Sequence, residues 1–171
     1  MKNSSLTKAI SYKDFKKEVL DDYKTILISR EASLLGRKEV LSGKAKFGIF
    51  GDGKELPQVA MAKVFEKGDF RSGYYRDQTF MFSIGKLTVQ QFFAGLYANT
   101  NFDEEPMSGG RQMGSHFSSV FVDEKGKFKD LPNQYNISSD VSPTSGQMPR
   151  LLGLAMASKC LSLGNLNSSS V

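Results

Sequence analysis

Residues 70–78 read FRSGYYRDQ, and this stretch joins an extended segment to a helix. Its first five residues suit a short strand, and the residues that follow favour a helix over 76–84. Tyr75 and Arg76 therefore fall at the junction, where the first backbone amides of the helix have no partner within it. A phenol, a guanidinium and free amides together favour an anion such as phosphate. An ordinary aromatic packing site with a surface arginine explains the same residues equally well.

The sequence upstream of this junction predicts two helices. Ser11 resembles a helix cap, and apolar residues then recur at helical spacing over residues 13–35, which predicts an amphipathic helix ended by Gly36. A second helix is expected to begin at Asp52, whose carboxylate would cap it, and to end at Gly68. The first hundred residues are thus expected to be mostly helical.

The sequence downstream predicts another helix, a long loop, a strand and a last helix. Thr88 is a suitable cap for the next helix, and residues 99–121 are rich in Gly, Ser, Asn and Met without a regular period. A loop of this length is usually functional or disordered. A short strand is expected over 134–138, and a helix rich in small residues begins within 146–149. Helices that alternate with short strands predict an α/β fold.

Composition excludes several classes of protein. The 171 residues are 39% hydrophobic and 24% charged, which is typical of a globular domain. The single cysteine, Cys160, cannot form an internal disulfide and is expected on the apolar face of the last helix, so a cytoplasmic location is predicted. No apolar run is long enough for a membrane span. The net charge of +5 comes from bases scattered among acids, which argues against a nucleic-acid partner.

Other motifs suggest ligand contacts less directly. The single histidine, His116, lies in the long loop without an Asp or Cys at a spacing typical of a catalytic triad or a metal site. Residues 138–149 read SSDVSPTSGQMP and gather hydroxyl groups ahead of a helix, where they could bind a polar ligand or simply cap the helix. GDG at 51–53 starts like the magnesium motif of thiamine enzymes but lacks its asparagine, so a turn before a helix is the better interpretation.

Four strings in order carry a family resemblance: FGDGKELPQVAMAKVF, SGYYRDQ, SGGRQMGSHFSS and DVSPTSGQMPRLLGLAMASK. Together they resemble the alpha subunit of the thiamine diphosphate-dependent first component of 2-oxo acid dehydrogenase complexes, over about residues 13–159. The string GGRQM at 109–113 is closer to the branched-chain 2-oxo acid members than to the pyruvate members.

The resemblance implies roles for particular residues. By position, Tyr75 and Arg76 would bind the diphosphate of the cofactor. Ser142 and Thr144 match the segment that meets its aminopyrimidine ring, with Thr144 acting mainly through its backbone.

Two further positions match the family less completely. Gln147 matches a residue of a potassium-binding turn, but Gly146 stands where a hydroxyl residue usually precedes the glutamine. His116 matches a histidine near the mouth of the active site, the only residue of this chain that the resemblance offers as a catalytic candidate.

The resemblance also implies what the complete enzyme does. It would decarboxylate a 2-oxo acid, and would pass the acyl group to the lipoyl domain of a dihydrolipoyl acyltransferase. The ligands of magnesium and the glutamate that activates thiamine match no residue here, and the glutamate belongs to a beta subunit or a fused beta region. An oligomer is therefore expected.

Residues 1–171 are accordingly expected to form the amino-terminal part of a thiamine diphosphate-binding alpha-subunit domain, incomplete here. Residues 1–12 are expected to be flexible and 160–171 to be a truncated end. The expected fold is a mostly helical amino-terminal part with the first strands of a parallel sheet, inactive by itself. A non-catalytic interaction subunit of the same fold, without cofactor, is the alternative.

Overall fold

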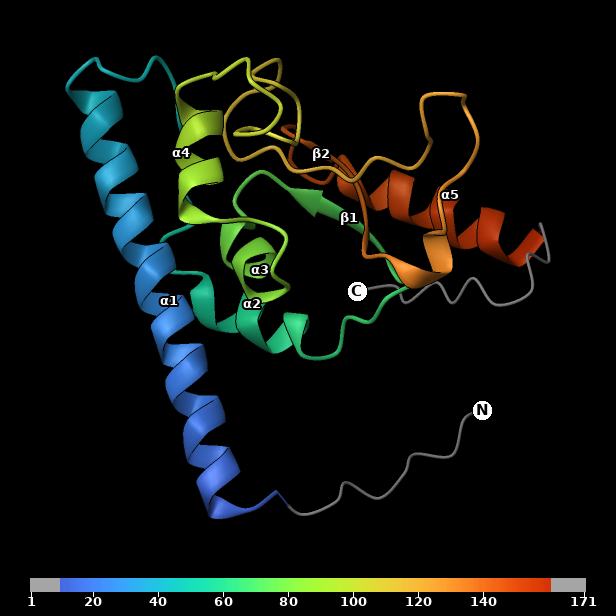
Figure 1. The fold of residues 1–171 in the computed structure, drawn as a ribbon, viewed down its shortest axis with the longest axis horizontal. Coiled ribbons are helices and arrows are strands. Elements are labelled where there is room, and N and C mark those ends of the chain that lie inside the picture. Colours follow the sequence, from blue (N-terminus) through green and yellow to red (C-terminus); the bar gives the residue numbers. More distant parts are fainter. Residues whose placement is uncertain (1–9, 161–171) are drawn as a thin grey trace.

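A computed structural model describes residues 10–160, without the side chain of Cys160. The elements follow the order α1 (Tyr12–Leu41), α2 (Glu55–Ala62), β1 (Phe70–Tyr74), α3 (Gln78–Ser83), α4 (Val89–Leu96), a 3-10 turn (Leu131–Asn133), β2 (Asn136–Val141) and α5 (Gln147–Cys160). Figure 1 shows α1 along one edge, α2 to α4 beside it, and α5 on the far side of the two strands. The prediction of a mostly helical first hundred residues is confirmed for residues 10–100, the part of that range that the structure describes.

The two strands form a parallel pair, consistent with a fragment of an α/β fold. Phe70 lies opposite Asn136 and Ser72 opposite Ser138, with an irregularity before Tyr74 pairs with Val141. Parallel strands need a crossover connection, which α3, α4 and the long loop provide here. The second strand is Asn136–Val141 rather than 134–138, so it reaches almost to Ser142.

The core lies between α1, the strands and the helices of the crossover. Its members are aromatic and aliphatic side chains: Phe50, Phe65, Phe80, Met81, Leu87, Phe92, Leu96, Phe117 and Ile137. Ile137 on β2 is fully buried. Helices α1 to α4 and β2 are therefore held together by one apolar cluster.

Helix α1 differs from its prediction at the end. The cap at Ser11 is confirmed, since its hydroxyl accepts a hydrogen bond from the Asp14 amide at 3.2 Å. The helix does not end at Gly36, however, but continues to Leu41. A Cβ atom at Gly36 would lie 2.5 Å from the buried Phe50 ring. The glycine therefore lets the helix approach the core closely instead of ending it.

The buried side of α1 is also not the predicted one. It consists of small residues, Ser29, Ala32, Ser33 and Gly36. The Ser29 hydroxyl lies 2.6 Å from that of Thr79 on α3. The large apolar residues of the expected face are exposed instead: Phe15, Val19, Tyr23, Leu27, Leu34 and Leu35.

Helix α2 begins later and ends earlier than predicted. Its cap residue is Lys54, which makes no side-chain hydrogen bond to the helix. Asp52 does not cap the helix because its carboxylate pairs with Arg37 at 2.6 Å. The helix ends at Ala62, although Phe65 beyond it is buried in the core. Residues 51–53 form the turn before it, as expected.

Helices α3 to α5 match their predictions in type, with smaller differences in extent. Thr88 and Gln91 form a complete capping box at the start of α4. Helix α3 is shorter than 76–84, since it spans Gln78–Ser83. Helix α5 is observed to Cys160, and the part of its prediction at Leu161 lies outside the described residues.

The close contact at Gly36 gives the first prediction. Gly36→Ala should lower the unfolding free energy by about 1–3 kcal/mol, because its methyl group overpacks against Phe50. Gly153→Ala on α5 is the matched control, since a Cβ atom there meets nothing within 4 Å. That change should raise stability by up to about 1 kcal/mol through helix propensity. Urea denaturation followed by circular dichroism measures both, and an equal gain in both variants would contradict the packing.

Candidate functional site

Tyr75 and Arg76 lie in the turn between β1 and α3, and not in the first turn of a helix as predicted. The Asp77 carboxylate accepts a hydrogen bond from the Tyr74 amide at 3.0 Å and closes this turn. Helix α3 then begins at Gln78. An anion at this place would therefore be bound by the side chains of Tyr75 and Arg76 rather than by the start of a helix.

The side chains of Tyr75 and Arg76 contact each other. One Nη atom of Arg76 lies 3.4 Å from the Tyr75 hydroxyl, and the guanidinium carbon lies 5.4 Å from the centre of the Tyr75 ring. Interaction with the Tyr74 hydroxyl, and next with Arg76, lowers the pKa of Tyr75. The Nε atom of Arg76 is buried and has no hydrogen-bond partner among the described residues. A charged donor is thus left for an acceptor from elsewhere.

His116 and Ser142 join this pair from distant parts of the chain. The imidazole stacks on the Tyr75 ring, with the ring centres 5.6 Å apart and the planes at 10°. Its Nε2 atom lies 2.7 Å from the Ser142 hydroxyl, just beyond the end of β2. Four of the residues that the sequence singled out therefore form one continuous cluster: Tyr75, Arg76, His116 and Ser142.

Thr144 and Gln147 lie near this cluster without joining it through a side-chain contact. Thr144 is exposed, two residues beyond Ser142. The Gln147 side-chain oxygen is buried without a hydrogen-bond partner among the described residues, and its backbone oxygen accepts a bond from Ser72 at 3.0 Å. Within residues 10–160 no group of three or more His, Cys, Asp or Glu side chains is placed to hold a metal ion.

A buried arginine that sequence reasoning missed holds the segments of the cluster together. Arg71 on β1 forms ion pairs with Asp77 and with Asp140, the latter at 3.1 Å. The Asp140 carboxylate also accepts a hydrogen bond from the Phe117 amide at 3.2 Å. Burial raises the pKa of Asp140 to about 7, although the Arg71 charge favours the ionised form. The only sequence signal was an arginine at an inward-facing position of a strand.

Gly73 makes room for this arginine. A Cβ atom at Gly73 would lie 1.8 Å from the Arg71 guanidinium, next to the irregular pairing of β1. The guanidinium also lies 5.1 Å from the centre of the Phe80 ring. The irregular pairing of β1, its glycine and its buried charge are therefore parts of one arrangement.

A second buried carboxylate, that of Glu105, orders the loop before His116. It accepts hydrogen bonds at 2.8–2.9 Å from the amides of Met107, Ser108 and Gly110 and from the Ser108 hydroxyl. Burial by itself would raise the pKa of Glu105, but these hydrogen bonds outweigh it and lower the pKa. The loop has no regular structure, as predicted, but its backbone is fixed around this side chain.

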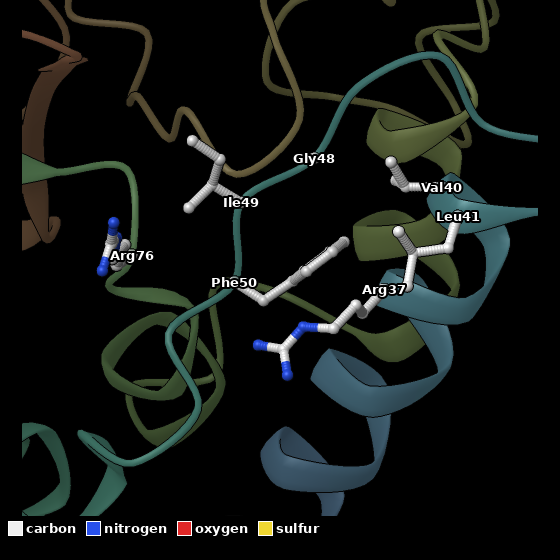
Figure 2. A pocket seen from close by; sticks show the side chains of 7 residues that line it. All are labelled: Arg37, Val40, Leu41, Gly48, Ile49, Phe50 and Arg76. Carbon is white, nitrogen blue, oxygen red and sulfur yellow. The ribbon is translucent and has the colours of Figure 1, made fainter. Parts of the chain in front are cut away.

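A pocket opens between Arg76 and helix α1. Its volume is about 390 Å³, and its lining combines apolar side chains with two arginines: Arg37, Val40, Leu41, Gly48, Ile49, Phe50 and Arg76. Figure 2 shows the Phe50 ring extending toward α1, with Arg76 on the opposite side of the segment 48–50. Arg37 is paired with Asp52, so Arg76 supplies the uncompensated positive charge.

Comparison with known proteins tests the family resemblance. No family model matches the chain. Most of this chain is nevertheless homologous to a 2-oxo acid dehydrogenase alpha subunit. It is similar to 2-oxoisovalerate dehydrogenase subunit alpha of Bacillus subtilis (strain 168), with 31% identity over 147 residues, 83% of this chain and 38% of that protein. The resemblance predicted from the motifs is confirmed, and the chain spans well under half the length of this relative.

None of the helices in residues 10–160 is long and apolar enough to span a membrane.

The central place of Arg71 gives the second prediction. Arg71→Met should lower the unfolding free energy by about 3–5 kcal/mol, because it leaves the buried Asp140 carboxylate without a counter-charge. Arg37→Met is the matched control, since it breaks a more exposed ion pair and should cost less than about 1 kcal/mol. Urea denaturation at pH 7.5 compares the two, and similar small losses would show that Arg71 does not support the fold.

Proposed function

We propose that this chain is the amino-terminal part of the alpha subunit of a thiamine diphosphate-dependent 2-oxo acid dehydrogenase, and that Tyr75 and Arg76 bind the diphosphate. The observation that carries the proposal is the buried Arg76 Nε atom without a partner in the described chain, beside the Tyr75 hydroxyl. A buried donor left unpaired costs about 1–3 kcal/mol, and more when it is charged. A diphosphate oxygen would satisfy it with a charge-assisted hydrogen bond.

The neighbouring residues suit the rest of the cofactor. The stacked rings of Tyr75 and His116 form a flat wall, and Ser142 fixes the imidazole from the other side. Ser142 and the backbone at Thr144 would hold the aminopyrimidine ring, since both offer polar groups next to this wall. His116 orients this contact, and a role for it in moving protons is not needed. For the potassium turn, the free oxygen of Gln147 is compatible with a cation, but Gly146 supplies no hydroxyl ligand.

The pocket beside Arg76 supports a branched-chain substrate. Its apolar lining at Val40, Ile49 and Phe50 matches an aliphatic side chain. Because the pocket borders Arg76, which would hold the diphosphate, a substrate in it would lie next to the cofactor. The name of the relative, a 2-oxoisovalerate dehydrogenase subunit, agrees with this choice.

The chain provides binding and orientation in this proposal, while the cofactor carries the reaction. When bound, thiamine diphosphate supplies the chemistry that removes carbon dioxide from a 2-oxo acid. The acyl group would then pass to a lipoyl arm of the acyltransferase. The magnesium ligands and the activating glutamate would come from outside these residues, the glutamate from a beta subunit or fused region. We propose a cytoplasmic oligomer of such subunits.

The test is cofactor affinity in the assembled enzyme. Arg76→Ala should weaken thiamine diphosphate binding by about 1.5–3 kcal/mol, because a charge-assisted hydrogen bond to the diphosphate is lost. Arg76→Lys should recover part of this loss, since a lysine carries the charge without the planar fork of donors. Isothermal titration calorimetry measures the affinity of each variant.

The control is Arg111→Ala, which removes an exposed arginine outside the cluster and should leave the affinity unchanged. An Arg76→Ala variant that binds as tightly as the parent would show that the anion site lies elsewhere. An assembled parent enzyme that binds no thiamine diphosphate would favour the alternative, a non-catalytic subunit of the same fold.

A further inference from the structure

Strand β1 has one edge without a neighbouring strand. The sheet described in residues 10–160 consists of β1 and β2 alone, so each strand has one outer edge. The outer edge of β2 is covered by the loop that follows His116. There the Ser119 amide donates a hydrogen bond to the Ile137 carbonyl at 2.8 Å. The Asp140 amide likewise donates to the Phe117 carbonyl at 3.0 Å.

The register of the two strands identifies the free backbone groups of β1. Phe70 lies opposite Asn136, whose amide donates to the Asp69 carbonyl at 3.1 Å. In a parallel pair with this register the Arg71 amide points toward β2, whereas the amides and carbonyls of Phe70 and Ser72 point away from it. We call these the outward groups of β1. They form no hydrogen bond with any described residue, so they are open to pairing with a further strand.

A groove of about 350 Å³ lies beside residues 71–74 of β1, and both layers that cover the sheet contribute to its walls. Met61 of α2 and Phe80 of α3 line it from one face, and Met148 and Leu151 of α5 line it from the other. A groove that reaches both layers must pass an edge of the sheet rather than lie on one face. Because β2 occupies one side of β1, the groove lies along the outer edge of β1.

The path of the chain indicates which strand this groove would accept. Helices α3 and α4 connect β1 to β2 across the face on which Ile137 and Phe80 are packed. Helix α5 leaves β2 on the opposite face, where the Ser72 hydroxyl donates to the Gln147 carbonyl at 3.0 Å (Figure 1). Connections between parallel strands are right-handed in nearly all proteins. Two such connections on opposite faces run in opposite directions across the sheet. A strand that follows α5 would therefore lie on the side of β1, beyond β1.

We propose that an apolar strand that follows α5 in the complete alpha subunit enters this groove and pairs in parallel with the outward groups of β1. Because helices would cover both of its faces, this strand would be a nearly continuous run of apolar residues. Strand β1 would become a central strand, and the turn that carries Tyr75 and Arg76 would follow a strand paired on both edges. The proposal rests on the proposed function in one respect, namely that the subunit continues beyond α5.

The test is hydrogen exchange at single amides of β1 in the complete alpha subunit, measured by NMR before and after the beta subunit is added. An edge strand protects every second amide, whereas a central strand protects all of them. The amides of Phe70 and Ser72 should therefore exchange within about tenfold of those of Arg71 and Gly73 in the alpha subunit alone. Nuclear Overhauser contacts from Phe70 and Ser72 should lead to residues that follow α5.

Two results would overturn the proposal. One is exchange at the Phe70 and Ser72 amides that is more than about tenfold faster than at Arg71 and Gly73 in the alpha subunit alone. The other is protection that appears only with the beta subunit, which would assign the groove to a partner. An alpha subunit with protected outward amides that assembles but binds no thiamine diphosphate would keep this proposal and contradict the proposed function.

Leu151→Glu and Leu152→Glu are a matched pair of variants for the same measurement. Leu151 lines the groove, whereas Leu152 does not line it and is 71% exposed. A carboxylate at 151 should displace the strand, so that the outward amides exchange at least about tenfold faster while the amides that face β2 change less. Leu152→Glu should leave all of them unchanged. Unchanged outward amides in a folded Leu151→Glu variant would contradict the proposal, and if that variant does not fold the parent measurement decides.

Discussion

The ion pairs of Arg71 are the interaction on which the arrangement of the candidate site depends. Through Asp77 the arginine fixes the turn that carries Tyr75 and Arg76, and through Asp140 it fixes the end of β2 beside Ser142. Because Asp140 also binds the Phe117 amide, the same contact positions the backbone next to His116. A buried charge that is fully paired is costly to disturb, since breaking one pair leaves an isolated charge. Three distant segments are therefore held in one place by one side chain.

The site combines this rigid support with an unfilled donor. Arg71 and Glu105 are buried and have several partners, whereas the neighbouring Arg76 keeps a buried nitrogen without one in the described chain. A preorganised anion site requires two features. The hydrogen bonds of the supporting residues are made, and the binding group still has a free donor. The stacked pair of Tyr75 and His116 adds a flat surface to it. Together these features favour a ligand that joins an anion to an aromatic ring.

Local signals in the sequence predicted what local interactions determine. The helix cap at Thr88 and the strand at residues 70–74 depend on neighbours a few residues away, and both are confirmed. Asp52 does not cap its helix because Arg37, from another helix, binds its carboxylate. Gly36 does not end α1 because Phe50 needs its space. Contacts between distant residues outweighed the local preference in both cases.

The candidate site likewise combines local contacts that the sequence could predict with distant contacts that it could not. Tyr75 and Arg76 are adjacent in sequence, so their pairing could be predicted from the chain alone. The contact between His116 and Ser142 and the ion pair between Arg71 and Asp140, 69 residues apart, could not be predicted from local pattern. The family resemblance named His116 and Ser142 as site residues, but the structure was needed to bring them together. Arg71 was missed because a charged residue in a short strand carries no signal of its partner.

The most direct test of this account is the NMR spectrum of His116, which is the single histidine of the chain and gives one set of imidazole signals. Stacking on Tyr75 places its ring protons over an aromatic face, which shifts them upfield. The account predicts that Tyr75→Leu moves these signals downfield, whereas Tyr97→Leu, which changes a ring that stacks on Phe93, leaves them in place. Imidazole signals that are the same in the parent and in Tyr75→Leu would contradict the convergence of these segments into one site.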